Sequence, residues 1–401
     1  MALWFGIGFI GFSIAAAFPF ALYPLSLALF AKKRELRSDV SWRRPKLAVC
    51  MSAYNEEKVI VAKVESLLAM ALAYGPAEIY VYVDGAEDRT AELLRPYIGR
   101  IHLTISEKRR GKTAGLNLLV EQSDAPLLAF TDANVEAPHD ALVKLADRFA
   151  DSNVGCVSAR LTYDNKDESG VAAAGDAYWS LEEAIKHVES ETIGLIGVDG
   201  ALFMIEREAY ERAPEHLIDD LYVSLVALLN GRGAVSELSV VVHERGASRW
   251  REEYRRKVRI ACQAWRVHAA LWPRLKMLPT PQLYGYIAHR VLKWLTPFTV
   301  LAAGVCGLGL FVALAGWRPA LTATAAALAA GTFGVRFNIP PFRSLAMMLV
   351  SLAGVGKGAI EALISNRSYT VWTPAASVRT AVGPSQVSAV SGSTRRLAGE
   401  W

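Results

Sequence analysis

The segment that decides the fold is KLAVCMSAYNEEKVIVAKVESLLAMAL, residues 46–72. Its first third is a short apolar run of the kind found in buried parallel strands, and the rest has apolar residues at helical spacing. Asn55 and Glu56, both polar, stand at the junction. The pattern therefore predicts a strand that leads directly into a helix, which is the first half of a βαβ unit.

The same alternation continues along the chain. Further strand patterns occur at residues 78–85, 101–106, 126–134 and 154–163. Helical patterns lie between them, and strands that alternate with helices of ~10–15 residues predict an α/β fold with a mostly parallel sheet. Ligands bind such sheets beyond the carboxyl ends of the strands. Asp84, Asp132 and Asn134 follow strand ends, so we expect them at a binding site.

The two ends of the chain have a different composition, although 52% of all residues are hydrophobic. Residues 2–31 carry no charge and are followed by KKRELR, which predicts a retained anchor with residue 32 onward in the cytoplasm. The predicted organisation is an anchor at 1–31, a soluble α/β domain at 45–245, basic interfacial helices at 246–290, a membrane region at 291–364 and a disordered tail at 365–401.

Within the membrane region we predict spans at about 294–317 and 319–335. Residues 342–364 have a shorter apolar core between Arg343 and Lys357, so they form either an interfacial helix or a third span. Counted with the anchor, an interfacial helix there gives three spans and a basic tail in the cytoplasm, whereas a span there would be the fourth and would leave the tail outside. Either arrangement makes this a multi-pass membrane protein.

Two short motifs for nucleotide binding fail on inspection. GIGFIG at 6–11 has dinucleotide-site spacing but lies inside the anchor, where no strand precedes it. GKT at 111–113 ends like a P-loop, yet Ser106 stands where that motif needs glycine. The four cysteines are scattered, which argues against zinc and disulfides and suits a reducing cytosol. The basic segment 245–276 predicts contact with anionic lipids, and we expect no nucleic-acid partner.

Six short segments together resemble a known family. They are MSAYNEE (51–57), VDGAEDRT (83–90), RRGKTAGLN (109–117), FTDAN (130–134), GVDGALFMIERE (197–208) and IDDL (218–221). Their order and spacing are similar to those of membrane-bound family 2 glycosyltransferases, which include the cellulose, chitin and hyaluronan synthases. The resemblance covers residues 46 to about 266. It implies a GT-A fold, a Rossmann-like mixed sheet that is mostly parallel, flanked by transmembrane helices.

The resemblance assigns a nucleotide-sugar site to the first segments. It implies that Ala53, Tyr54 and Glu56, together with Asp84, hold the base and ribose of a nucleotide sugar. The alternative for Asp84 is a turn residue before Gly85. Lys112 would lie by the diphosphate or the base.

Asp132, Ala133 and Asn134 stand where the family carries Asp-x-Asp. The resemblance implies that Asp132 meets the diphosphate or its metal and that Asn134 coordinates Mg²⁺ or Mn²⁺, both of which prefer oxygen ligands. Asn134 brings one negative charge fewer than the family's aspartate, so we expect weaker metal binding. The alternative is a turn that holds no ion.

The segment IDDL stands where the family carries its catalytic aspartate. We therefore expect Asp220 to be the general base, and a second carboxylate beside it, Asp219, predicts a raised pKa for Asp220. The resemblance implies that Asp199, Gly200 and Ala201, with Asp219, contact the acceptor. The alternative for both aspartates of IDDL is a helix N-cap.

The segment YRRKVRIACQAW (254–265) stands at the position where the processive members of the family carry Gln-x-x-Arg-Trp. Aligned on Arg259, which we expect to stabilise the leaving diphosphate, Arg256 replaces the glutamine and Ile260 replaces the tryptophan. That tryptophan is the family's platform for the acceptor sugar, so its absence weakens the prediction of processive synthesis. An interfacial helix that touches lipid headgroups is the alternative for 255–259.

These observations predict an inverting glycosyltransferase of the plasma (cell inner) membrane with its catalytic domain in the cytoplasm. The donor is a nucleotide sugar, expected to be a UDP-sugar. The tail segment SYTVWTP resembles exopolysaccharide-type members, which favours a growing polysaccharide as acceptor. The alternatives are single-sugar transfer to a lipid carrier or glycolipid, and a non-catalytic membrane subunit. Three spans are few for a polymer pore, so export would need a homo-oligomer or a partner subunit.

Overall fold

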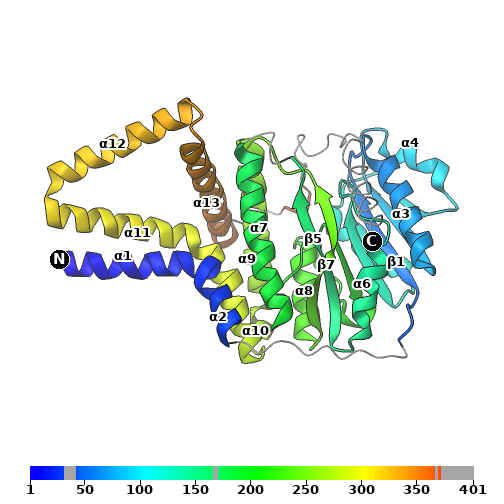
Figure 1. Cartoon of the computed structure of the whole chain (residues 1–401). Coiled ribbons are helices and arrows are strands. Elements are labelled where there is room, and N and C mark those ends of the chain that lie inside the picture. The colour runs from blue at the N-terminus through cyan, green and yellow to red at the C-terminus, as the bar shows by residue number, and fades with distance from the viewer. Residues whose placement is uncertain (31–41, 166–169, 366–368, 372–401) are drawn as a thin grey trace, which may run out of the picture.

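A computed structural model of the chain describes residues 1–30, 42–165, 170–365 and 369–371. Figure 1 shows two parts: a body built around a twisted sheet, and a group of long helices that project from one side of it. The N-terminus lies at the far end of the projecting helices.

The body contains a mixed sheet of seven strands in the order β3-β2-β1-β4-β6-β5-β7. The strands are β1 (Leu47–Ala53), β2 (Ala77–Asp84), β3 (His102–Ser106), β4 (Leu127–Asp132), β5 (Val154–Tyr163), β6 (Leu202–Glu206) and β7 (Gly233–Glu244). Strand β1 pairs in parallel with β2 and β4, and β6 is antiparallel to both of its neighbours. The predicted α/β fold with a mostly parallel, mixed sheet is confirmed.

Alternate residues of each central strand face opposite layers of helices, because side chains in a strand point to the two faces in turn. Leu47, Val49 and Met51 of β1 pack in the core beneath α3 (Ile60–Tyr74) and α6 (Ala141–Asp147). Ala48 and Cys50 pack in the core on the other face. That core includes residues of α5 (Lys112–Gln122), α8 (Asp219–Leu229) and α9 (Trp250–Leu275).

Helix α4 (Thr90–Leu94) belongs to the body and contacts α3. The remaining helices form the projecting part or lie on the side of the body next to it (Figure 1). They are α1 (Ala2–Ala17), α2 (Tyr23–Phe30), α7 (Gly170–Glu191), α10 (Thr280–Gly285), α11 (Leu292–Ala315), α12 (Trp317–Arg336) and α13 (Pro340–Ile364). Helix α1 lies along α11, and α13 lies along α9 and contacts α7 (Figure 1). The short π-helical segment Tyr286–Val291 connects α10 to α11.

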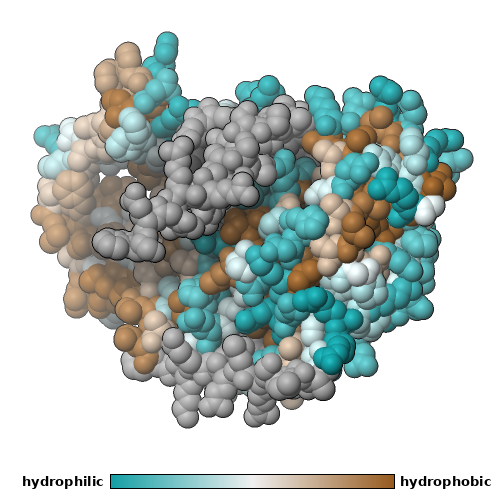
Figure 2. All heavy atoms as spheres, turned by 45° about the vertical axis from the view of Figure 1, so that its right-hand side comes forward, coloured by the Kyte–Doolittle hydropathy of each residue, from teal (hydrophilic) through white to brown (hydrophobic). Residues whose placement is uncertain are grey.

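In the described residues three helical stretches are long and apolar enough to cross a membrane: Ala2–Leu29, Thr280–Ala315 and Pro340–Ile364. Helix α12, where we predicted a span at 319–335, is not among them. The predicted stretch 342–364 lies within one continuous helix of 25 residues, Pro340–Ile364, which is among the three candidate spans. Figure 2 shows hydrophobic residues over the projecting helices and many hydrophilic ones over the body.

Candidate active site

The first predicted ligand residues lie at the carboxyl ends of β1 and β2. Ala53 ends β1 and is buried, and Asp84 ends β2. The Asp84 carboxylate accepts hydrogen bonds from the backbone N–H groups of Arg110 (2.6 Å) and Gly111 (3.1 Å). The Arg109 guanidinium lies 3.5 Å from the centre of the Tyr54 ring. Asp84 therefore fixes the loop that leads into α5, while the buried Glu56 lies beyond the end of β1.

Gly111 has φ of +96°, a conformation that favours glycine. A Cβ atom at this position would clash with the backbone of Thr370, which belongs to the C-terminal segment. Gln263 of α9 donates to the backbone oxygen of the neighbouring Tyr369 over 3.5 Å. Most of the predicted SYTVWTP segment lies outside the described residues, but its described part, 369–371, covers the start of α5.

Lys112 begins α5 and brings together several of the predicted residues. Its ammonium lies 2.7 Å from the Asp132 carboxylate and 3.4 Å from that of Asp219. Burial alone would lower the pKa of Lys112, but Asp132, Asp219 and Asp220 outweigh burial and raise it. We call Lys112, Asp132, Asp219 and Asp220 the site cluster.

Asp219 and Asp220 are the first two residues of α8, and the N-cap is Ile218. The N-cap alternative is therefore wrong for both. The Asp220 carboxylate accepts a hydrogen bond from the N–H of Leu221 (2.6 Å) at the helix N-terminus. Burial raises the pKa of Asp220 to about 7, and the charge of Asp219 adds to the effect. The raised pKa predicted from the paired carboxylates is confirmed, although burial is the larger cause.

The loop 196–201 packs against the site cluster. A Cβ at Gly200 would lie 3.0 Å from Oδ2 of Asp220 and 3.2 Å from the Lys112 ammonium, so a glycine allows this close approach. The backbone oxygen of Ala201 accepts hydrogen bonds from the N–H of Asp132 (3.3 Å) and the hydroxyl of Thr131 (2.9 Å). Asp199 is paired with Lys186 of α7, a partner that the sequence did not indicate.

Helix α9 runs past the site and contributes arginines. Arg259 donates to Gln263 over 3.1 Å, and Arg256 donates to the Tyr163 hydroxyl over 2.7 Å. Burial, together with the charge of Arg256, lowers the pKa of Arg259 to about 10, so it stays charged at neutral pH. The charges of Asp132, Asp219 and Asp220 oppose this shift. Trp265 packs with the aromatic ring of Trp294 instead of facing the site.

Sequence reasoning missed Glu244 and Thr113, two residues that shape the site, whereas it expected Asn117 to fix the helix after Lys112. Glu244, at the end of β7, accepts a hydrogen bond from the Asn134 amide (3.2 Å), and burial raises the pKa of Glu244. Thr113 and Asn117 of α5 donate to the backbone oxygens of Leu217 and Ala213, which lie in the loop before α8. The sequence held one signal for Glu244: like Asp132, it is an acidic residue at the end of a strand.

Comparisons with known proteins agree with this fold. Residues 48–213 match the family described as Glycosyl transferase family 2. This part of the chain is a family 2 glycosyltransferase domain. The fold of the glycosyltransferase domain and its helices is similar to that of the mannosyltransferase PcManGT from Pyrobaculum calidifontis, solved in complex with GDP-Man and Mn²⁺. The TM-score is 0.66 at 21% identity, over 90% of this chain and all of that chain.

Two curated relatives are beta-monoglucosyldiacylglycerol synthases. The one from Nostoc sp. is 23% identical over 202 residues, which are 48% of this chain and 43% of the relative. The one from Synechocystis sp. is 23% identical over 309 residues, 67% of this chain and 63% of the relative. The chain thus matches less than two thirds of the length of each of these relatives.

Proposed function

We propose that this protein is an inverting glycosyltransferase that moves a single sugar from a nucleoside diphosphate sugar to a membrane lipid. The observation that carries the proposal is Asp220, a half-buried carboxylate with a pKa of about 7, set beside Gly200 and Lys112 at the carboxyl edge of the sheet. A carboxyl group with a pKa near the working pH suits a general base. The family match supports the reaction class.

In the proposed reaction an acceptor hydroxyl loses its proton to the Asp220 carboxylate as its oxygen attacks the anomeric carbon. The bond from that carbon to the diphosphate oxygen breaks, and the nucleoside diphosphate leaves with the electron pair. In-line attack inverts the configuration at this carbon. Lys112 and Arg259 supply positive charge toward the leaving diphosphate, where charge develops. Asp84 acts through the loop that it holds in front of α5.

The residues present fit a divalent cation of the Mg²⁺ or Mn²⁺ type. Asp132, Asn134 and Glu244 offer only oxygen ligands, which these ions prefer. In the described part of the chain no three His, Cys, Asp or Glu side chains converge as a metal site. This agrees with Mg²⁺ chemistry, in which one or two carboxylates act together with water and substrate phosphates. When bound, the ion would neutralise charge on the diphosphate, and Asp132 and Asn134 would hold it.

Three observations favour a lipid acceptor. The curated relatives named above are glycolipid synthases. In addition, Ile260 stands where the processive resemblance needs tryptophan, and Trp265 packs on Trp294. Helices α9 and α13 lie along each other, so an apolar helix approaches the site from the proposed membrane side. A lipid acceptor would reach Asp220 from there.

Polysaccharide synthesis is the second candidate. The described part of the C-terminal segment at 369–371 lies over Gly111, as expected if the SYTVWTP resemblance to exopolysaccharide-type members has a functional meaning. In this reading a homo-oligomer or a partner subunit would export the polymer. In both readings the chain is a multi-pass protein of the plasma (cell inner) membrane with its glycosyltransferase domain in the cytoplasm.

The test is to incubate the full chain, purified in detergent, with Mg²⁺ or Mn²⁺, diacylglycerol or a polyprenyl phosphate, and radiolabelled UDP- or GDP-sugars. We expect label in a single lipid-soluble product that depends on the added lipid and the metal. Label in high-molecular-weight, lipid-insoluble material would support the polysaccharide candidate instead. Absence of transfer with every donor and both acceptors would contradict the proposed function.

A further inference from the structure

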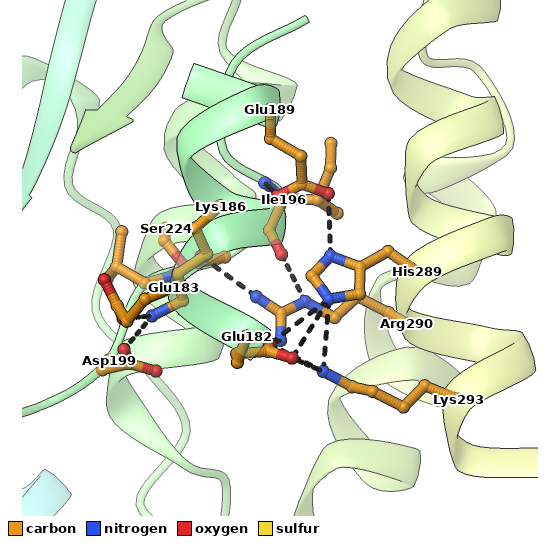
Figure 3. A network of polar contacts seen from close by, with 12 residues as sticks. Glu182, Glu183, Lys186, Glu189, Ile196, Asp199, Ser224, His289, Arg290 and Lys293 are labelled. Carbon is orange, nitrogen blue, oxygen red and sulfur yellow. Dashed lines mark hydrogen bonds and ion pairs between the residues drawn. The ribbon is translucent and has the colours of Figure 1, made fainter. Parts of the chain in front are cut away.

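A cluster of buried charges lies where α7 meets the membrane-side helices (Figure 3). Its members are Glu182 and Glu189 of α7, with His289, Arg290 and Lys293 from the stretch Thr280–Ala315. We call these five residues the anchor cluster. Each of them is buried or half-buried, and the two carboxylates are fully enclosed. None of them belongs to the site cluster described above.

Each carboxylate of the anchor cluster contacts several hydrogen-bond donors or cations. Glu182 accepts from Lys293 (2.7 Å) and from Arg290 (3.3 Å), and His289 lies within 3.4 Å. Glu189 accepts from the hydroxyl of Tyr23 (2.6 Å) and contacts His289 at 2.7 Å. Burial would raise the pKa of Glu182, but its cationic neighbours outweigh burial and hold that pKa well below its usual range. Glu182 therefore remains an anion within the fold.

Arg290 differs from its neighbours because it also contacts the backbone of the loop 196–200. Its Nε donates to the oxygen of Ile196, and one terminal nitrogen donates to the oxygen of Gly197 over 3.1 Å. Gly197 has φ of +95°, and a Cβ there would lie 3.1 Å from the same terminal nitrogen. Lys293, one turn further on, also pairs with Glu182. Its polar contacts are with Glu182 and His289 and not with the backbone of the loop.

The same loop is tied to the catalytic helix on its other side. The N–H of Val198 donates to the Ser224 hydroxyl over 3.2 Å, and that hydroxyl donates to the backbone oxygen of Asp220 over 2.7 Å. Two residues further along the loop, Gly200 approaches the Asp220 carboxylate. A continuous set of polar contacts thus runs from Arg290 through the loop to the residue that we assign as the base.

Stability alone does not explain why Arg290 contacts the loop as well as Glu182. A buried ion pair is weak evidence for stability, because the cost of removing the charges from water is about as large as their attraction. Ionisable residues within apolar spans are costly as well, and where they occur they mark function. Arg290 also lies in a π-helical segment, Tyr286–Val291, and such irregular turns are frequent at functional sites.

We propose that Arg290 is a positioning residue. From the membrane-side helix it holds the loop 196–200 against α8, and the loop in turn places the acceptor hydroxyl within hydrogen-bond distance of Asp220. This rests on the proposed transfer reaction. Removal of Arg290 would let the loop carbonyls move, and a displacement of about 1 Å near reacting groups costs on the order of 100-fold in rate. Donor binding, at Asp84 and Lys112, would be left in place.

The experiment compares Arg290→Gln with Lys293→Gln and Arg290→Lys in the full chain, purified in detergent. Lys293→Gln is the matched control, since it removes a cation from the same carboxylate without removing a loop contact. We expect Arg290→Gln to lower kcat about 10- to 100-fold with the donor KM within about twofold. Lys293→Gln should keep kcat within about threefold, and Arg290→Lys should restore part of the lost rate.

Hydrogen exchange provides a readout that does not need catalysis. The amides of Ile196 and Val198 are bonded to Glu189 and Ser224, so we expect faster exchange in the peptide covering 194–201 for Arg290→Gln and unchanged exchange for Lys293→Gln. Unchanged exchange in both variants, or an equal loss of kcat in both, would overturn the proposal. If the wild-type protein transfers no sugar, the proposed function fails, while the exchange data still decide whether Arg290 positions the loop.

Discussion

The site cluster, which is half-buried, and the anchor cluster, which is more deeply buried, are both groups of acids and bases, yet they are built in opposite ways. In the anchor cluster Glu182 and Glu189 are each enclosed by several donors from the membrane-side helices. In the site cluster Asp132 and Asp219 share a close cation, Lys112, whose charge also acts on Asp220. Burial, together with the charge of Asp219, raises the pKa of Asp220 to about 7.

The difference shows how a fold separates structural from reactive carboxylates. A carboxylate surrounded by cations keeps its charge over a wide pH range and cannot take up a proton near neutral pH. A carboxylate that is buried with a second carboxylate and one shared cation accepts a proton readily, as a general base must. The same residue types therefore hold helices in one cluster and, as we propose, carry the reaction in the other.

The largest expected effect is that of Asp220→Asn, which removes the proposed base. We expect kcat to fall about 10²- to 10⁴-fold, the range for loss of a positioned general base, while the protein still binds the nucleotide. Steady-state kinetics and calorimetry with UDP check both parts. Asp219→Asn is the matched control and should lose less, because Asp219 contacts Lys112 and is not the assigned base. Full transfer by Asp220→Asn would show that the base is wrongly assigned.

Lys112→Met should have the next largest effect, because it leaves Asp132 and Asp219 without their shared cation. We expect kcat/KM for the donor to fall about 100-fold, equivalent to about 2.7 kcal/mol. Lys112 also lowers the pKa of Asp220, so its removal should shift the acidic limb of the pH–rate profile to higher pH. Lys112→Arg, the control, retains the charge. An unshifted limb would show that the two groups are not coupled.

The pH dependence of the wild type gives a smaller, graded effect. The base works only when deprotonated, and the pKa of Asp220 is raised to about 7. We therefore expect kcat/KM to be level above about pH 7 and to fall about tenfold per pH unit below it. Kinetics in buffers of constant ionic strength check this. A level profile down to pH 5 would mean that Asp220 is ionised there and that the contrast between the two clusters is wrong.

The smallest effect should come from an ion pair outside both clusters. Arg44 donates to Asp147 over 2.8 Å, but both side chains are substantially exposed, at 39% and 49%. Exposed pairs of this kind contribute less than about 1 kcal/mol, so Arg44→Ala should lower the thermal stability only slightly and leave kcat unchanged. Thermal inactivation in detergent measures this. A large loss of stability would show that the exposure of an ion pair does not predict its contribution to stability in this protein.

The sheet and the residues at its edge could be predicted from the sequence because their signals are local. The apolar runs that became β1 to β5 each lead to a helix, and Asp84 and Asp132 stand directly after such runs. Strand β6 was not predicted, since its insertion between β4 and β5 is a long-range pairing with no trace in the five residues of the strand.

The anchor cluster could not be predicted for a related reason. Glu182 and Arg290 are 108 residues apart, and helical periodicity shows which face of a helix is apolar but not which helix packs against it. The one available signal was His289, Arg290 and Lys293 in front of an apolar span. The site roles of Asp132, Asn134, Asp220 and Arg259 stay predictions until the variants are measured.

The pairing of α1 with α11 carries a consequence for engineering. A Cβ built on Gly8 lies 2.8 Å from the sulfur of Cys306 and 3.6 Å from its Cβ, and Cβ atoms joined by a disulfide are ~3.5–4.5 Å apart. Gly8→Cys should therefore form a covalent link to the native thiol under mild oxidation. Cys50, Cys156 and Cys262 are buried and should not compete. The anchor would then be locked to the second apolar helix, and the loss of two titratable thiols per chain, restored by a reductant, would reveal the bond.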